Sequence, residues 1–260
     1  MKVKILGSGT STGVPLVGCT CHVCLSDNPR NKRLRTSAFI STDCGQDVLI
    51  DTSTDLRQQC LREGITNVDK VLYTHCHADH VYGIDDLRPF NFKKRQSIEA
   101  YADSITAKDL LIHFDYCFRE STSGSSVPQL TLKKIEPYEI FKIGDLEILP
   151  LPIMHGNLRV MAYRIGNFAY LTDGSFIPEK TRENLIGLDY LIINGLRERA
   201  HSTHFTISGA VTEIKTIKPK KSYLTHLSHE VDYDAGNKLL KTLSNLDIEL
   251  AYDGLELAIN

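Results

Sequence analysis

The chain has 260 residues, of which 42% are hydrophobic and 24% are charged, and its formal net charge is −2. This composition predicts an ordered protein with one large α/β domain or two small ones. The charge argues against a broad nucleic-acid or acidic-membrane surface, but not against an anionic substrate at a metal site. Without an apolar run of about 18 residues, or a signal-peptide segment at the start, we expect a cytoplasmic protein.

The chain begins with a predicted strand at residues 3–7 and a glycine-rich turn at residues 7–13. Three cysteines follow, Cys19, Cys21 and Cys24, at a spacing typical of a tetrahedral structural zinc site. The candidates for the fourth ligand are His22, His229 and a distant cysteine. His22 would strain the chelate ring, so we favour His229 and expect a zinc loop at about residues 17–30.

The other cysteines do not indicate a disulfide framework, because the total of seven is odd and no export signal is expected. We expect these four to be buried thiols: Cys44, Cys60, Cys76 and Cys117.

A hairpin is predicted for residues 35–42 and 46–51, with a glycine in its turn. Asp51 ends the second strand, where it could orient a metal-binding histidine as a hydrogen-bond acceptor. Alternatively it could cap the helix predicted at residues 54–63, although Ser53 or Thr54 suits that role better.

The most informative segment follows a predicted strand at residues 68–73 and contains four potential metal ligands within six residues. In an extended segment, residues i and i+2 point the same way, so His75 and His77 can reach one metal ion. A turn at Ala78 would direct Asp79 and His80 toward a second ion. Imidazole and carboxylate ligands together suit zinc, manganese or iron. Three of the ten histidines lie in these six positions, which disfavours an ordinary polar loop.

The next part of the chain is less informative. A helix is expected to start at residues 84–88, and a strand at 98–101 precedes a helix at 103–119. The inner side of that helix should carry five apolar residues: Ile105, Leu110, Leu111, Phe114 and Phe118. His113 is expected to be an ordinary histidine, and residues 121–126 a flexible turn. Strands are predicted within residues 131–151, divided at 144–145.

Three further ligand candidates stand at strand ends, namely His155, Asp173 and His226. The strands and helices alternate to the C-terminus, with helices predicted at 178–185, 207–217 and 234–243, strands at 163–165, 168–173, 188–194 and 221–225, and a final pair of strands through residue 259. His201 and His204 precede the helix at 207–217, whose N-terminus favours a phosphate group.

The His-x-His-x-Asp-His string and the later ligands resemble the metal-binding signature of the metallo-β-lactamase superfamily over nearly the whole chain. The resemblance implies an α/β (α+β) fold, a four-layer αββα sandwich with two mixed sheets, as a single domain over residues 1–260. It implies two divalent metal ions, zinc or manganese, in addition to the structural zinc. By resemblance, one ion would be bound by His75, His77 and His155, the other by Asp79, His80 and His226, and Asp173 would bridge them.

Within the superfamily, the cysteine insert and the pair His226 and His229 are similar to the phosphoribosyl cyclic-phosphate phosphodiesterases of the phosphonate (carbon–phosphorus lyase) pathway. This implies hydrolysis of a small cyclic or linear phosphodiester by a hydroxide that bridges the two metal ions. Asp79 and His204 are the expected catalytic residues. His204 and Thr206 match the His-x-Thr motif of the related tRNA 3′-processing endonucleases, since His204 lies 22 residues before His226.

Other functions on this fold stay open. They are a thioesterase or lactamase, a tRNA 3′-end endonuclease, an iron redox enzyme, a protein like that of the pyrroloquinoline quinone pathway, and a non-catalytic metal-binding protein. The endonucleases usually have an arginine in place of His229 and a long arm for tRNA, so nucleic acid is not the expected partner. We expect a small-molecule substrate, no membrane, and a possible homodimer.

Overall fold

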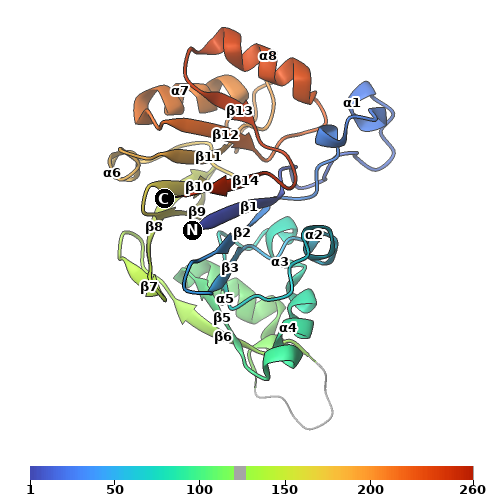
Figure 1. The fold of residues 1–260 in the computed structure, drawn as a ribbon. Coiled ribbons are helices and arrows are strands. Elements are labelled where there is room, and N and C mark those ends of the chain that lie inside the picture. The colour runs from blue at the N-terminus through green and yellow to red at the C-terminus, as the bar shows by residue number, and fades with distance from the viewer. Residues whose placement is uncertain (120–126, 260) are drawn as a thin grey trace.

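The computed structural model describes residues 1–119 and 127–259, so the turn expected at 121–126 lies outside the described residues. Two seven-stranded sheets pack face to face with helices on both outer sides, which confirms the four-layer αββα prediction (Figure 1). The order of the first sheet is β14 (Glu256–Ala258), β1 (Lys2–Gly7), β2 (Ser37–Ser41), β3 (Asp47–Ile50), β4 (Lys70–Leu72), β5 (Ile98–Ala102) and β6 (Leu130–Lys134). The order of the second is β13 (Ile248–Leu250), β12 (Lys221–Thr225), β11 (Tyr190–Asn194), β10 (Phe168–Leu171), β9 (Leu158–Ile165), β8 (Leu146–His155) and β7 (Phe141–Ile143).

Both sheets are mixed in the same way. In the first sheet, strands β14, β1, β2 and β3 are antiparallel neighbours, and β3 to β6 are parallel. In the second, β7 to β10 are antiparallel and β10 to β13 are parallel. The carboxyl ends of the parallel strands in a sheet meet at one edge, where α/β proteins place their ligands. The expected final pair of strands is present as β13 and β14, which belong to different sheets.

Three helices cover the outer face of the first sheet: α2 (Leu56–Glu63), α4 (Arg88–Lys94) and α5 (Ser104–His113). The second sheet is covered by α6 (Glu179–Glu183), α7 (Ile207–Ile217) and α8 (Tyr233–Leu243). Short helical turns connect these elements: α1 (His22–Leu25), α3 (Ala78–Val81), and the 3-10 turns Pro29–Asn31, Ile84–Leu87 and Asp115–Cys117. The predicted bounds of α7 and β12 are confirmed residue for residue.

The apolar core forms three layers that correspond to the alternating faces of the strands. The layer between the sheets includes Ile40, Tyr163 and Phe168, all fully buried. One outer layer lies under α2, α4 and α5, and the other lies under α6, α7 and α8. The sandwich therefore holds the strand ends of both sheets on one rigid frame.

The helix predicted at residues 103–119 is shorter than expected. The Asp103 side chain accepts a hydrogen bond from the backbone N–H of Thr106 at 2.9 Å and so caps α5, which ends at His113. The predicted inner side of the helix is also wrong for two residues, Ile105 and Leu111, whose side chains are 41% and 42% exposed. The buried face of α5 instead contains Thr106, Ala107 and Leu110.

Two further details concern the four scattered cysteines and the glycine-rich turn. The expectation of a buried Cys44 is wrong, since this thiol is exposed at the tip of the β2–β3 hairpin, while Cys60 and Cys117 are buried and Cys76 is half-buried. At Gly7, the first residue of the glycine-rich turn, a Cβ atom would lie 1.9 Å from the carbonyl oxygen of Arg35, so a larger residue does not fit there.

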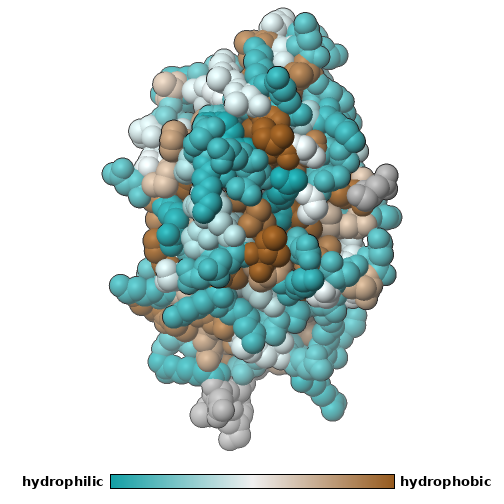
Figure 2. Space-filling view, turned by 90° about the vertical axis from the view of Figure 1, so that its left-hand side faces the viewer, coloured by the Kyte–Doolittle hydropathy of each residue, from teal (hydrophilic) through white to brown (hydrophobic). Residues whose placement is uncertain are grey.

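The face of the molecule shown in Figure 2, the left-hand side of Figure 1, is largely hydrophilic, with apolar residues in patches separated by polar ones. Among the residues that the structure describes, no helix combines the length and the hydropathy that crossing a bilayer requires.

Candidate metal centre

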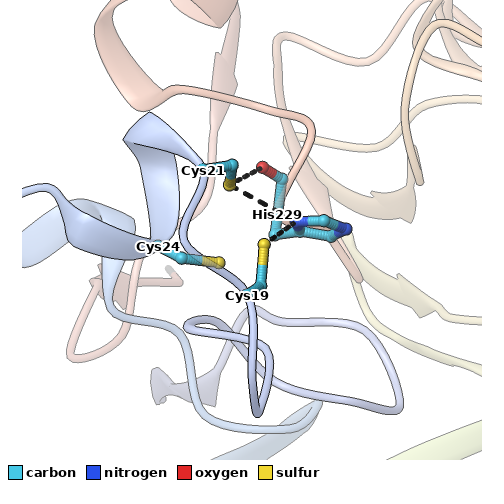
Figure 3. Close-up of side chains that lie close together, drawn as sticks. All are labelled: Cys19, Cys21, Cys24 and His229. Atoms are coloured by element: carbon cyan, nitrogen blue, oxygen red, sulfur yellow. Dashed lines mark hydrogen bonds between the residues drawn. The ribbon is translucent and has the colours of Figure 1, made fainter.

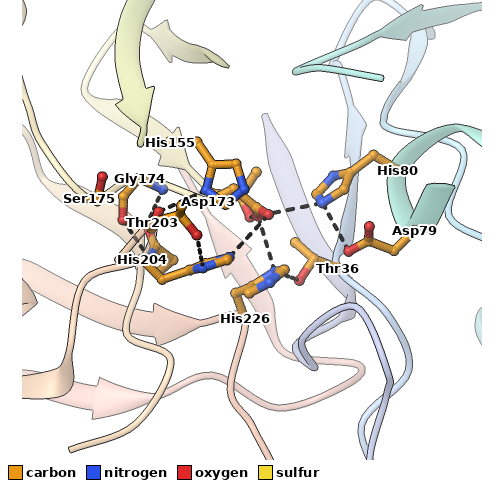
Figure 4. Close-up of polar contacts among 12 residues, drawn as sticks. Thr36, Asp79, His80, His155, Asp173, Gly174, Ser175, Thr203, His204 and His226 are labelled. Atoms are coloured by element: carbon orange, nitrogen blue, oxygen red, sulfur yellow. Dashed lines mark hydrogen bonds and ion pairs between the residues drawn. The ribbon is translucent and has the colours of Figure 1, made fainter. Parts of the chain in front are cut away.

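The buried carboxylate of Asp173 is the centre around which the predicted ligands gather (Figure 4). It follows β10, and imidazoles from three other segments of the chain approach it. Its oxygens lie 3.1 Å from His226 Nδ1, 3.4 Å from His80 Nε2 and 3.4 Å from His204 Nε2. His75 Nε2 is 3.8 Å away. One carboxylate thus connects histidines from both sheets.

The potential ligand atoms form three groups that share Asp173. Potential ligand atoms of Asp79, His80, Asp173 and His226 lie within 4.8 Å of one another, as do those of His75, His77 and Asp173. These two sets bring together the residues expected at the two metal sites, except for His155. At this spacing His155 groups with Asp173 and His204, although its ring centroid is only 5.1 Å from that of His77.

Short local elements direct these side chains. His75 lies three residues after the end of β4, and His77 precedes the single helical turn α3, which turns Asp79 and His80 inward. All of them are buried except His77, which is exposed at the rim. Cys76 points away from the ligands, as expected, and its thiol lies 3.5 Å from the carbonyl oxygen of Thr106.

The ionisation of the cluster suits cation binding. Burial lowers the pKa of His226 to about 4 and that of His75 well below its usual value, which keeps both imidazoles neutral. Burial also disfavours a charged His80, yet the surrounding carboxylates, those of Asp79 and Asp173 foremost, raise its pKa well above the usual value. The positive charge of a protonated His80 therefore offsets the negative charge of these carboxylates, and a bound metal cation would do the same in its place.

Unsatisfied polar atoms test whether the residues fit a metal. Within the described residues, five buried atoms of this cluster have no hydrogen-bond partner: His75 Nε2, Asp79 Oδ2, His80 Nε2, His204 Nε2 and His226 Nε2. A buried polar atom without a partner is costly, and a bound ion is one of the few ways to satisfy it. Nitrogen and carboxylate donors in this number fit divalent transition metals.

Asp51 supports the cluster from behind. Its Oδ2 lies 2.7 Å from His80 Nδ1 and accepts a bond from the Thr74 hydroxyl, while its Oδ1 accepts the Thr74 backbone N–H at 2.8 Å. The residue is fully buried and does not cap α2, which begins after Asp55. The geometry is that of a carboxylate orienting a ligand histidine, the first of its two expected roles.

Backbone strain marks three of these positions. Asp51, Asp173 and His226 have φ values of 60°, 58° and 58°, in the left-handed region that non-glycine residues rarely adopt. Such conformations cost about 1–3 kcal/mol each and persist where the surroundings impose them. Each residue directly follows or nearly follows a core strand, so the strain turns its side chain into the site.

Of the two histidines before α7, His204 faces the cluster. Its side chain is 11% exposed and its Nε2 is 3.4 Å from Asp173 Oδ2, whereas His201 is exposed and contacts His204 from the outside. The intervening Thr203 also contributes, because its carbonyl oxygen accepts a 2.7 Å hydrogen bond from His155 Nδ1.

The site also contains one polar contact that the sequence does not indicate. The Thr36 hydroxyl lies 3.0 Å from His226 Nδ1 and donates to the carbonyl oxygen of Gly9 at 2.7 Å. Threonine is common at strand starts, so nothing in the local sequence distinguishes this one.

The second candidate metal site lies at the cysteine loop (Figure 3). Ligand atoms of Cys19, Cys21, Cys24 and His229 lie within 4.8 Å of one another. His229 Nδ1 is 3.3 Å from Cys19 Sγ and 3.5 Å from Cys21 Sγ. A hydrogen bond from the Cys24 backbone N–H, with help from His229, lowers the pKa of Cys21 to about 6, so this thiol ionises easily. Four donors of this type at this spacing fit a tetrahedral zinc ion.

Comparisons with known proteins agree with this architecture. The family model of the beta-lactamase superfamily domain matches residues 46–227. The crystal structure of a new diphosphatase from the PhnP family has a TM-score of 0.91 and 38% sequence identity, over 100% of this chain and 98% of that one. The Zn²⁺-bound PqqB of Methylobacterium extorquens, at 19% identity and a TM-score of 0.79 over 100% of both chains, shares the fold.

A curated protein of Porphyromonas gingivalis, named octanoyltransferase, is 42% identical over 261 aligned residues. The alignment covers 100% of this chain and 52% of that protein, so the chain spans about half the length of this relative.

Proposed function

Because the chain belongs to the β-lactamase superfamily, a family of metal-dependent hydrolases, we propose that it is a dinuclear phosphodiesterase acting on a small cyclic or linear phosphodiester. The observation that carries the proposal is that the ligand group of His75 and His77 and the ligand group of Asp79, His80 and His226 both include the carboxylate of Asp173. Two metal ions held by one bridging carboxylate are the arrangement that in-line displacement at phosphorus uses. The 38% identity to a solved diphosphatase supports chemistry at phosphorus.

Seven residues would hold the two ions. His75, His77 and His155 would bind one, Asp79, His80 and His226 the other, and Asp173 both. When bound, zinc or manganese ions would supply an activated water and positive charge for the phosphate oxygens. The cysteine loop would hold a third ion, zinc, with a structural role.

The remaining polar groups of the site would act on the substrate and on its protons. His204 lies beside Asp173 and two residues before Thr206, which caps α7. Its Nε2 has no hydrogen-bond partner among the described residues and lies 3.4 Å from Asp173 Oδ2 in the cluster, so it would give a proton to the leaving oxygen. Asp79, 3.2 Å from His80 Nε2, would contribute negative charge that orients the attacking water.

The test is hydrolysis of bis-p-nitrophenyl phosphate by metal-free protein resupplied with Mn²⁺ or Zn²⁺. We expect turnover that requires added metal and is lost in Asp173→Ala, together with a lower metal count per chain. Asp145→Ala, which removes an exposed carboxylate at a distant turn, is the matched control and should behave as wild type. No turnover by wild-type protein that binds its metals would contradict the phosphodiesterase proposal and favour a thioester, lactam or redox substrate.

A further inference from the structure

Arg33 is a fully buried arginine between the cysteine loop and the candidate metal centre. It is 1% exposed, and burial lowers its pKa to about 10 against the opposing effect of Asp253 and Asp232. Its Nε has no hydrogen-bond partner among the residues described. Burying a guanidinium is costly, so its position calls for a reason beyond filling space.

The two ends of the guanidinium bind two different segments. Nη1 donates to the carbonyl oxygen of Ser228 at 3.1 Å, and Nη2 donates to Asn31 Oδ1 at 3.1 Å. Asn31 is itself buried, accepts the Tyr233 backbone N–H at 2.8 Å and donates to Asp232 at 2.8 Å. One end of the Arg33 guanidinium is thus held, through Asn31, by the start of α8. The other end holds the carbonyl group of Ser228.

Ser228 stands between the two candidate metal sites. It is two residues after His226 and one before His229, so one short segment supplies a ligand to each site. Its backbone N–H donates to the carbonyl oxygen of Leu196 at 3.0 Å, and Leu196 in turn bonds Phe205, the residue after His204. The peptide of residue 228 is therefore held from both sides, by Arg33 and by the segment that leads to His204.

We infer that Arg33 is a positioning residue, which sets the segment from His226 to His229 so that its two histidines face separate metal sites. A lysine cannot replace it fully, because the planar guanidinium serves two acceptors at a fixed angle and an ammonium group does not. The effect on turnover rests on the proposed function, whereas the effect on zinc binding at the cysteine loop does not.

The experiment compares Arg33→Met and Arg33→Lys with Arg35→Met in the zinc-loaded, full-length protein. Arg35 lies on the same segment but pairs with Asp55, away from residues 226–229. Three quantities are measured: zinc affinity of the cysteine site by competition with a chelator, hydrogen exchange at the Ser228 amide, and kcat and KM on bis-p-nitrophenyl phosphate.

In Arg33→Met we expect zinc affinity lower by about 10–100-fold, the loss typical of removing an outer partner of a metal site. Exchange at Ser228 should be faster, and kcat should fall with KM little changed. Arg33→Lys should show smaller losses of the same kind, and Arg35→Met should match wild type in zinc affinity and Ser228 exchange.

Wild-type zinc affinity and Ser228 exchange in folded Arg33→Met would overturn the inference. Equal losses in Arg35→Met would also overturn it, since they would reflect general destabilisation. If Arg33→Met does not fold, Arg33→Lys decides by the same two readouts. Inactive wild-type protein would count against the proposed function, while zinc affinity and exchange would still decide the role of Arg33.

Discussion

Asp51 and Asp173 approach opposite nitrogens of a single imidazole, that of His80. The distances are 2.7 Å from Asp51 to Nδ1 and 3.4 Å from Asp173 to Nε2. Both aspartates are buried, both have φ near +60°, and each follows the strand at which its sheet changes from antiparallel to parallel. One carboxylate from each sheet therefore fixes the ring, which ties the orientation of a metal ligand to the packing of the sandwich.

Replacing Asp51 should weaken metal binding without removing a ligand. Asp51→Asn keeps an oxygen for the Thr74 N–H but loses the charged acceptor for His80 Nδ1. We expect a loss of about 10–100-fold in metal affinity at the active centre, measured by titration of the metal-free protein. Asp253→Asn is the control, because the side chain of Asp253 is also largely buried, at 7% exposure, but bonds Ser8, Leu34 and Arg62 instead. A similar loss in both variants would speak against a specific role for Asp51.

Replacing His204 should separate catalysis from metal binding. His204→Ala removes the proposed proton donor, so kcat on a phosphodiester should fall by about 10²–10⁴-fold while the metal count stays the same. His201→Ala removes the exposed neighbour and should cost far less. Steady-state kinetics with metal analysis of both variants checks this, and unchanged kcat in His204→Ala would exclude the acid role.

The cysteine loop should lose its ion when a thiolate ligand is removed. Cys24→Ser should lower the metal content by one zinc per chain. If the ion contributes a few kcal/mol, the thermal midpoint should fall by about 5–10 °C, since 1 kcal/mol corresponds to ~2–4 °C for a chain near this size. Cys44→Ser, at an exposed thiol outside the cluster, is the matched control. Three metals per chain in Cys24→Ser would contradict this assignment.

An ion pair on the first sheet should make a small, pH-dependent contribution to stability. The hydrogen bond from Lys70 lowers the pKa of Glu99 below its ordinary value of 4.5. A lowered carboxylate pKa stabilises the fold above the unfolded-state value, and this effect disappears as the pH falls through the folded-state value.

In urea unfolding at pH 7, Glu99→Gln should therefore cost about 0.2–1 kcal/mol, and the difference from wild type should shrink toward zero near pH 3. Glu147→Gln removes one partner of a more exposed pair, with Lys142, and should cost less at pH 7. A cost for Glu99→Gln that does not change with pH would mean that packing, rather than charge, is responsible.

The strand ends and their ligands were the most predictable part of the molecule. His75 and His226 each follow a short run of β-forming residues, so their position at a sheet edge could be expected before the structure was known. His229 could be paired with the cysteine loop because a tetrahedral site needs a fourth donor. In each case the metal-binding chemistry of a histidine restricts where its side chain can lie in the fold.

Residues that act through distant contacts could not be found in this way. Thr36 meets His226 across 190 residues of sequence, and Arg33 meets Ser228 across 195. Neither residue type is unusual, and only the packed fold brings the partners together. The wrong inner face of α5 has a related cause, since Ile105 and Leu111 are apolar but the helix turns them away from the first sheet.

The two ends of the described chain lie next to each other (Figure 1). The amino group of Met1 donates to the carbonyl oxygen of Ile259 at 3.1 Å, and the Ile259 N–H donates to Met1 at 2.9 Å. The six-residue strand β1 separates Met1 from the site edge by ~20 Å, at about 3.3 Å per residue. A second protein module attached at either end, or a linker joining the two ends, would therefore begin at the opposite end of β1 from the candidate metal ligands.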